Sequence, residues 1–259
     1  MIVQDTHHRD SIALTSFGTN INAAIVGATG GIGSGFAHHL CHCGAVANLV
    51  QLARSVPHDR ANNADWFAID LEDEDSIKLA SDTIKRGVGE LHLVIVATGI
   101  LHNGEDLKPE KTWREVSGPA MASAFQLNTI GPALVAKHFL PLLAKDRKSV
   151  FSALSARVGS IEDNRLGGWH AYRASKAALN MVIKTLSIEL ARRNPNALCV
   201  GLHPGTVDTR LSKPFQRGVA PERLFSPADS AKYLLNVLDR LTPEDSGHVY
   251  AWDGVRIPA

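Results

Sequence analysis

The chain has 259 residues, of which 44% are hydrophobic, and this is enough for one large α/β domain with a sizeable core. The net charge of +1, with acidic and basic residues interspersed, excludes a basic face for nucleic acid and a polybasic stretch for a membrane surface. No apolar run reaches the ~18 residues that suggest a membrane span. Three cysteines without disulfide-framework spacing, and residues 1–20 without a secretory pattern, predict a cytoplasmic protein.

Short apolar runs alternate with longer helical patterns, which predicts repeated βαβ units around a parallel sheet. Residues 1–20 are predicted to be a tail, partly ordered by packing, and residues 21–259 a single domain. The segment 204–227 lacks a periodic pattern and is predicted to be a substrate loop. The expected strands are 22–27, 47–53, 66–70, 91–97, 148–154, 197–203 and 247–251. The expected helices are 31–43, 73–86, 119–144, 170–193 and 227–241.

A glycine turn follows the first expected strand and opens the first helix. Gly27, Gly31 and Gly33 permit positive φ and a close approach of the backbone, so a dinucleotide diphosphate can lie against free N–H groups at the helix N-terminus. The alternative is a plain strand-to-helix turn. The strand before it and the helix after it favour the cofactor site.

Two positions bear on the adenosine end of such a cofactor. About twenty residues after the turn, a carboxylate would select NAD and an arginine NADP. Arg54 occupies this stretch without a carboxylate, which predicts NADP (NADPH) over NAD, although a plain surface arginine is the alternative. Asp70, at the end of the third expected strand, would bind the adenine amino group or simply cap the next helix.

Tyr172 and Lys176 lie one helical turn apart, on the same face of an expected helix. A phenol titrates near ~10, and a nearby cation favours its ionised form, so the pair suits proton exchange near neutral pH. This chemistry fits hydride transfer to or from a carbonyl. The alternative is a solvated helix face.

Four landmarks in this order resemble the short-chain dehydrogenase/reductase family, and within it the C-factor-like carbonyl reductases. They are Gly27-x-x-x-Gly31-x-Gly33, Asn128 in Leu127-Asn-Thr-Ile-Gly131, Tyr172-x-x-x-Lys176, and Pro204-Gly-Thr-Val-Asp-Thr209. The similarity extends from Asn22 to Pro258. It implies a single-domain Rossmann fold with a doubly wound parallel sheet of seven strands, a nicotinamide cofactor, and a small-molecule carbonyl or alcohol substrate.

The resemblance also implies roles for individual residues. Tyr172 would give its proton to the carbonyl oxygen, while Lys176 would lower the pKa of the phenol and hold the nicotinamide ribose. Asn128 would anchor a water, and a serine hydroxyl would polarise the carbonyl. The implied cofactor contacts are Gly27, Thr29, Gly30, Gly31, Ile32, Gly33, Arg54, Asp70, Leu71, Thr98, Gly99, Tyr172, Lys176, Pro204, Gly205, Val207 and Thr209.

The chain departs from the family's pattern most seriously at the serine. The position three residues before Gly159, where the family has this serine, holds Ala156, and Ser155 lies one residue earlier. Ser155 would still reach the carbonyl if the strand end carried a bulge; otherwise its side chain points to the other face of the sheet. We favour Ser155, with Ser152 and Ser160 as alternatives. Val26 and the run Val96-Ala-Thr-Gly99 also differ from the family, with smaller expected effects.

Three further expectations concern metal binding, His170 and assembly. The cluster from His38 to Cys43 lies on the helix behind the diphosphate and lacks the closed set of about four ligands that zinc needs, so no metal site is expected. His170 lines the substrate mouth or is structural. The resemblance implies a homodimer or homotetramer formed through the expected helices 119–144 and 170–193. The apolar positions offered for this contact, unless they pack inside one subunit, are Leu134, Phe139, Leu179, Ile183 and Leu186.

The predicted function is NAD(P)-dependent oxidation or reduction of a carbonyl/alcohol pair. The alternative is a nucleotide-binding signalling or regulatory protein that keeps the fold with little catalysis. Tyr172 and Lys176 favour the enzyme, whereas Ala156 favours the alternative. Substrate specificity is expected to depend on the loops after Pro204 and around 99–113, and the sequence does not identify the substrate.

Overall fold

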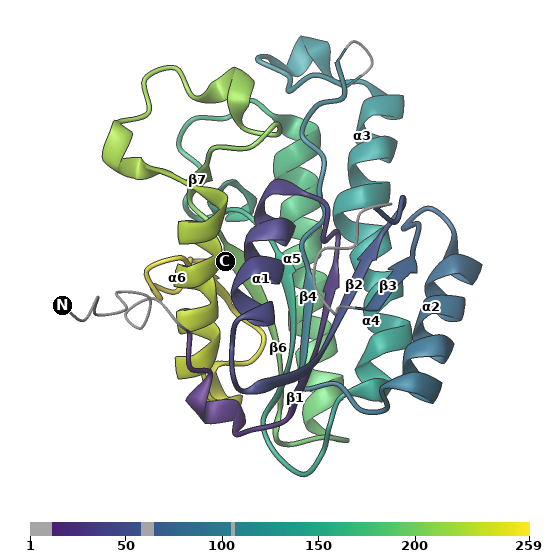
Figure 1. Ribbon diagram of the computed structural model, residues 1–259. Helices are drawn as coiled ribbons and strands as arrows, with labels where there is room; N and C mark the ends of the chain where they lie inside the picture. The colour runs from purple at the N-terminus through teal and green to yellow at the C-terminus, as the bar shows by residue number, and fades with distance from the viewer. Residues whose placement is uncertain (1–11, 58–64, 105–106) are drawn as a thin grey trace, which may run out of the picture.

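The computed structural model describes residues 12–57, 65–104 and 107–259, which form an α/β fold around one parallel sheet (Figure 1). Its seven strands follow the order β3-β2-β1-β4-β5-β6-β9, and every neighbouring pair is parallel. This order reverses between β1 and β4, the point where ligands bind in doubly wound folds. The predicted fold is confirmed. The strands are β1 (Ile21–Val26), β2 (Val46–Ala53), β3 (Asp65–Ala68), β4 (Leu93–Val96), β5 (Ser149–Leu154), β6 (Ala197–His203) and β9 (Val249–Ala251).

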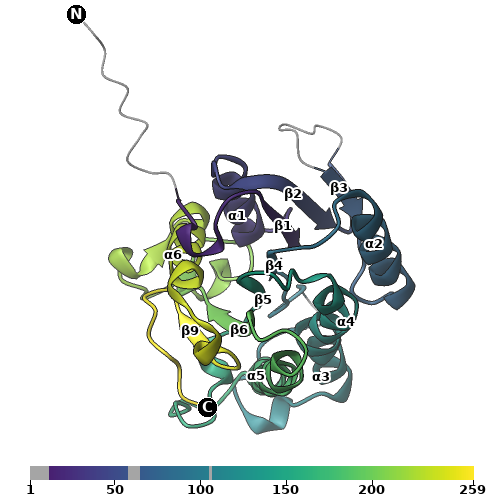
Figure 2. The same cartoon turned by 90° about the horizontal axis from the view of Figure 1, so that it is seen from below.

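Helices cover both faces of the sheet, as Figure 2 shows. One face carries α1 (Gly31–Cys41) and α6 (Pro227–Arg240), whose buried side chains share one apolar cluster. The other carries α2 (Glu74–Gly87), α4 (Gly131–Phe139) and α5 (His170–Ala191), which share a second cluster. The helix α3 (Gly118–Phe125) packs on α5. Alternate residues of each strand therefore enter opposite cores.

The single helix expected over 119–144 is interrupted. A π-helical turn, Gln126–Ile130, separates α3 from α4, and a short 3-10 turn, Leu140–Leu142, follows α4. Pro132 has no N–H to donate to the carbonyl of Asn128 four residues earlier, so regular α-helical bonding fails there. Gly131 also packs so closely on Leu71 that an added Cβ would lie 2.8 Å from the Leu71 Cβ.

The segment 204–227 contains structure that its sequence does not predict. β7 (Thr206–Val207) pairs in parallel with β8 (Leu224–Phe225), and 3-10 turns at Lys213–Phe215 and Pro221–Arg223 lie between them. We call residues 204–227 the covering segment; it projects at the upper left of Figure 1, above α6 and on the carboxyl-end side of the sheet. The pairing of β7 with β8 joins its two ends.

The described part of the predicted tail packs against the body of the domain. Leu14 and Phe17 are buried in the cluster under α6, and a 3-10 turn spans Thr15–Phe17. Lys148 Nζ donates to Ser16 Oγ at 2.8 Å and to the Leu241 carbonyl at 2.7 Å. Residues 12–20 are thus part of the fold, and residues 1–11 lie outside the described part.

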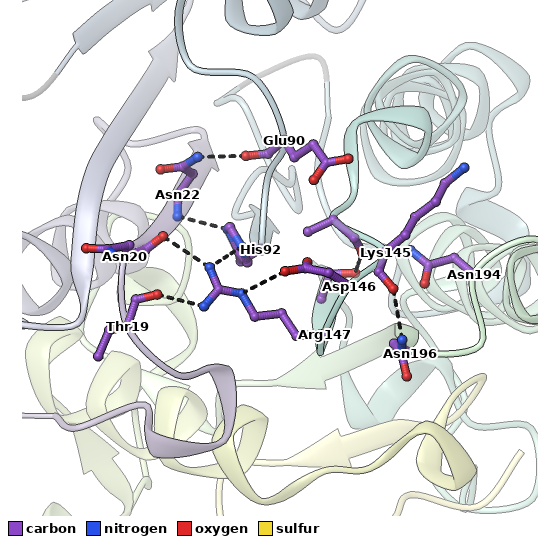
Figure 3. A network of polar contacts seen from close by, with 12 residues as sticks. Thr19, Asn20, Asn22, Glu90, His92, Lys145, Asp146, Arg147, Asn194 and Asn196 are labelled. Atoms are coloured by element: carbon purple, nitrogen blue, oxygen red, sulfur yellow. Dashed lines mark hydrogen bonds and ion pairs between the residues drawn. The ribbon is translucent and has the colours of Figure 1, made fainter.

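A polar network fixes the amino ends of β1, β4 and β5 (Figure 3). Arg147 donates to the Thr19 carbonyl at 2.7 Å, and its Nη2 lies 2.7 Å from His92 Nε2. His92 Nδ1 in turn accepts from the Asn22 N–H at 3.1 Å. Burial and the Arg147 guanidinium lower the pKa of His92. These contacts tie residues 19–22 to the segments that precede β4 and β5.

Candidate functional site

The turn between β1 and α1 forms a cradle for an anion. Gly27 has φ 87°, and an added Cβ at Gly33 would lie 2.1 Å from the Gly27 carbonyl oxygen, so both positions require glycine. Gly30 is the N-cap of α1, and no side chain caps the helix. Thr29, Gly30 and Gly31 are exposed. The first N–H groups of α1 consequently face solvent, where a diphosphate would find donors and the positive end of the helix dipole.

Two threonines border this cradle. An added Cβ at Gly31 would lie 2.6 Å from Thr209 Cγ2, and one at Gly27 would lie 2.8 Å from Thr98 Cγ2. Thr98 Oγ1 is buried, and within the described residues it has no hydrogen-bond partner. An orphaned hydroxyl beside free N–H groups fits a polar ligand such as a dinucleotide. Pro204, Gly205 and Val207 belong to the same covering segment as Thr209.

The adenosine end of the predicted site is built from the ends of β2 and β3. Arg54 is exposed just beyond β2, and no ion pair in the described part of the chain includes it. Asp70 accepts from the Glu72 N–H at 3.0 Å, whereas the side chain that caps α2 is Asp73. Helix capping therefore does not explain Asp70, and its adenine contact stays a prediction.

Tyr172 and Lys176 both lie on the first turns of α5. Lys176 is 2% exposed, its Nζ donates to the Leu154 carbonyl at 2.7 Å, and it lies 5.8 Å from the centroid of the Tyr172 ring. Gly99, after β4, lies over this ammonium, because an added Cβ would be 3.4 Å from Nζ. The sheet end, β4 and α5 thus bring the predicted pair together.

Burial determines the ionisation of this pair more than their mutual proximity does. Removal from water raises the pKa of Tyr172 to about 12 and lowers the pKa of Lys176 to about 7. Burial thus disfavours both charged forms, and the expected lowering of the phenol pKa by Lys176 stays a prediction. Tyr172 is accordingly a protonated phenol at neutral pH, the state that a proton donor needs.

Asn128 lies at the π-helical turn and is fully buried. Its Oδ1 accepts from the Ile100 N–H at 2.8 Å, and its Nδ2 donates to the Ile100 carbonyl at 2.8 Å and to Ser175 Oγ at 3.1 Å. The side chain is committed to holding the segment after β4 against α5. Pro132 cannot donate to the Asn128 main-chain carbonyl, and a water anchored at Asn128 stays a prediction.

Ser155 does not meet the condition under which it was expected to act. β5 pairs with β6 in regular register through Leu154, without a bulge. Ser155 Oγ is 3% exposed and donates to Asn180 Oδ1 on α5 at 2.6 Å. The hydroxyl is engaged in holding α5 to the sheet, so the geometry removes the basis for a catalytic Ser155. Ser152 Oγ donates to the Val94 carbonyl and Ser160 Oγ to the Ala259 carbonyl.

An aromatic wall beside Tyr172 was missed from the sequence. The Trp169 ring lies 6.3 Å from the Tyr172 ring and 5.0 Å from Phe215, and His102 lies 5.7 Å from Phe215, centroid to centroid. His102 Nε2 is also 3.1 Å from the Leu211 carbonyl. The segments after β4 and β6 therefore meet next to the phenol. Only the proximity of Trp169 to Tyr172 in sequence signals this wall.

His170 lies on the other side of α5. It lines a cavity of about 450 Å³ together with Met121, Arg173 and Ala177, and Tyr172 is not among the lining residues. The expectation that His170 lines the substrate mouth is not supported by this position.

The histidine and cysteine cluster of α1 forms local contacts. The His38 and His42 ring centroids are 5.0 Å apart, and Cys41 Sγ is 3.0 Å from His42 Nδ1. In residues 12–57, 65–104 and 107–259, no group of three or more His, Cys, Asp or Glu side chains is arranged to hold a metal ion. No helix in these ranges is long and apolar enough to cross a bilayer.

Comparison with known proteins agrees with this architecture. The family model described as short chain dehydrogenase matches residues 22–220. The chain belongs to the short-chain dehydrogenase family. It is 30% identical over 227 residues to an uncharacterized oxidoreductase of Schizosaccharomyces pombe, a match that covers 83% of each chain. It is 37% identical over 138 residues to the C-signal protein of Myxococcus xanthus, which covers 53% of this chain and 78% of that protein.

A solved structure extends the comparison to the fold. The NADPH-bound carbonyl reductase from chicken fatty liver matches with a TM-score of 0.78 at 26% identity, over 93% of this chain and all of the other. The predicted resemblance to carbonyl reductases and the predicted oxidoreductase class are confirmed.

Proposed function

We propose that the protein is an NADPH-preferring carbonyl reductase that transfers hydride between a nicotinamide cofactor and a small carbonyl or alcohol substrate. The observation that carries this proposal is the position of the Tyr172 phenol ring, whose centroid lies 5.8 Å from Nζ of the buried Lys176 at the carboxyl end of the sheet. The uncapped glycine turn of α1 opens at the same end. A proton donor and a dinucleotide cradle at one sheet edge are what carbonyl reduction requires.

The chemistry can be assigned to the chain's own residues. A bound nicotinamide would supply or accept the hydride. Tyr172 holds its proton at the phenol oxygen until negative charge develops on the substrate oxygen, and the proton then moves to that oxygen. Lys176 is fixed by the Leu154 carbonyl and contributes positive charge when protonated, which opposes the effect of burial on the phenol.

The choice of NADPH is supported by Arg54. The side chain is exposed at the end of β2 without an ion-pair partner among the residues that the structure describes, so its guanidinium is available to a 2′-phosphate. The chicken carbonyl reductase, which shares this fold, has NADPH bound.

The function is tested by following NADPH oxidation with a panel of aldehydes, ketones and quinones. Tyr172→Phe should lower turnover at least about a hundredfold, the lower range for general acid catalysis, with NADPH affinity nearly unchanged. Tyr233→Phe is the matched control, because Tyr233 packs on Phe225 and Trp252 from α6. Near-normal turnover in Tyr172→Phe would remove the assignment. Tight NADPH binding without turnover on any carbonyl would instead favour the regulatory alternative.

We also propose a two-fold homo-oligomer in the cytoplasm. Phe139, Leu179 and Ile183, which were expected at the subunit contact, are buried in the chain's own core. The support comes instead from α5 positions on the outside, because Met181 is 67% and Ile188 48% exposed. Cys41, Cys43 and Cys199 form no disulfide with one another, which suits a reducing compartment.

A further inference from the structure

We propose that Glu110 is a positioning residue for the proton donor. Its buried carboxylate caps α5 from a separate segment and thereby sets the orientation in which Tyr172 meets the substrate. The inference rests on the proposed function, because it assigns the residue that fixes the catalytic phenol.

The helix that carries Tyr172 begins without a cap of its own. Gly167, Gly168 and Trp169 have φ values of 63°, 66° and 52°, three successive left-handed residues before the first helical turn. Trp169 is the N-cap of α5, and its side chain accepts no hydrogen bond from the helix. By contrast, α2 and α6 are capped by their own N-cap residues, Asp73 and Ser226. A first turn with open N–H groups requires another partner.

Glu110 supplies that partner from the segment between β4 and α3. Its main-chain carbonyl accepts from the Trp169 N–H at 2.5 Å. Its carboxylate oxygens lie 3.2 and 3.3 Å from the Ala171 N–H. Gly168 runs so close to Glu110 that an added Cβ would be 3.2 Å from the Glu110 carbonyl oxygen. One residue therefore holds both the left-handed turn and the first helical turn.

The contact satisfies both the buried Glu110 carboxylate and the open N–H groups of α5. Glu110 is 4% exposed, and no ion pair among the described residues includes it. A buried carboxylate without a cation is unfavourable unless hydrogen bonds and dipoles compensate it. The N-terminus of α5 provides both, since its N–H groups and the positive end of its dipole face the anion.

The contact reaches Tyr172 through one peptide unit. Ala171 precedes Tyr172 directly, and the Trp169 ring packs at 6.3 Å from the phenol ring. If the first turn of α5 rotated or frayed, the phenol and the aromatic wall would move together. Displacements of about 1 Å in a reacting group can lower a rate ~10²-fold. The expected effect of losing Glu110 is therefore on turnover more than on cofactor binding, because the glycine turn of α1 is on a different helix.

Kinetics of three Glu110 variants test the proposal against a simple loss of stability. Glu110→Gln keeps an acceptor oxygen at the same reach and should retain kcat within about threefold, whereas Glu110→Ala should lower kcat about ten- to a hundredfold, as expected for misplacement of a reacting group. Glu110→Asp keeps the negative charge, but its shorter side chain no longer reaches the Ala171 N–H. Its kcat should therefore fall by about as much as that of Glu110→Ala. The Kd for NADPH should change less than about twofold in each. Asp73→Ala removes the cap of α2 and should lower Tm while kcat stays normal.

Hydrogen exchange gives a readout that does not depend on turnover. In Glu110→Ala and Glu110→Asp, amides at 169–175 should exchange faster, while those at 179–190 stay protected. This result would support the positioning role even if wild-type protein reduced no carbonyl, in which case only the proposed function would fail. The proposal is overturned if exchange at 169–175 is unchanged, if kcat is unaffected in Glu110→Asp, or if Asp73→Ala lowers kcat equally. Should Glu110→Ala fail to fold, the Glu110→Asp and Glu110→Gln pair decides.

Discussion

The close approach of the covering segment to the glycine turn predicts a rescuable defect. In Gly31→Ala, the new methyl group would lie 2.6 Å from Thr209 Cγ2. Thr209→Ser removes that methyl and leaves Thr209 Cβ, at 3.2 Å, as the nearest atom. The second substitution should therefore relieve much of the first. Gly33→Ala is the contrasting variant, because its methyl would lie 2.1 Å from the Gly27 carbonyl oxygen, which no side-chain change removes.

The size of the effect follows from the overlap. Carbon atoms in contact lie ~3.5–4.0 Å apart, so the added methyl in Gly31→Ala overlaps Thr209 by about 1 Å. Overpacking of this kind costs ~1–3 kcal/mol of unfolding free energy. For a chain of this length that corresponds to a fall in Tm of about 2–12 °C. Gly33→Ala should exceed this range or fail to fold, since the main chain has to move.

A double-mutant cycle measures the prediction. Thermal unfolding and titration with NADPH are recorded for wild type, Gly31→Ala, Thr209→Ser and the double variant. The double variant should recover at least about 1 kcal/mol relative to the sum of the single changes, a coupling typical of residues in contact. A coupling near zero in both stability and NADPH affinity would show that Thr209 does not pack on the α1 turn, and the described cradle would be wrong.

Further predictions concern four other places. Arg54→Ala should weaken NADPH by ~1.5–3 kcal/mol while NADH binding stays unchanged, and equal losses in titration calorimetry would reduce Arg54 to a surface charge. Ser155→Ala should lower stability by ~1–3 kcal/mol through the lost bond to Asn180 while turnover stays near normal; a ten- to thousandfold loss of turnover, with stability unchanged, would restore its catalytic role. Burial lowers the pKa of Lys148 from 10.5 to about 8. Between pH 8 and 10.5 the unfolded chain therefore binds more protons at this residue than the folded chain, so stability should rise with pH. The Tm of wild type minus the Tm of Lys148→Met should increase across this interval. An unchanged difference across that interval would contradict the shift. Met181→Asp should reduce the mass seen by light scattering, and a monomeric wild type at micromolar concentration would refute the proposed oligomer.

Local patterns predicted most of the fold. β1 and α1 were expected at 22–27 and 31–43 and are found at Ile21–Val26 and Gly31–Cys41, because an apolar run and a glycine turn act within a few residues. Tertiary contacts explain the differences. The break at Gln126–Ile130 reflects Pro132 and the packing of Gly131 on Leu71, which lies far away in sequence. The pairing of β7 with β8 likewise joins residues distant in sequence, Thr206 with Leu224 and Val207 with Phe225.

The candidate site divides in the same way. Tyr172 and Lys176 could be named from their spacing, since a helix places i and i+4 on one face. The direction of the Ser155 side chain could not be predicted from the sequence, because a one-residue change of strand register would reverse it. Glu110 and Trp169 were not recognised as site residues either. Glu110 lies far from α5 in sequence, and its carboxylate contacts a main-chain N–H of that helix, so no local sequence pattern signals its role.

The ionisation of Tyr172 shows why spacing alone could not give the mechanism. Spacing supplies a cation next to a phenol, and that proximity by itself lowers the phenol pKa. Burial opposes that effect by disfavouring the charged form of each group, and it depends on the fold, because the Trp169 ring lies beside Tyr172 and Gly99 lies beside Lys176 Nζ. With a pKa of about 12 for Tyr172 and about 7 for Lys176, the uncharged pair is favoured near neutral pH and above. A cofactor or substrate that brings negative charge beside Lys176 would favour its ammonium form, which assists proton transfer.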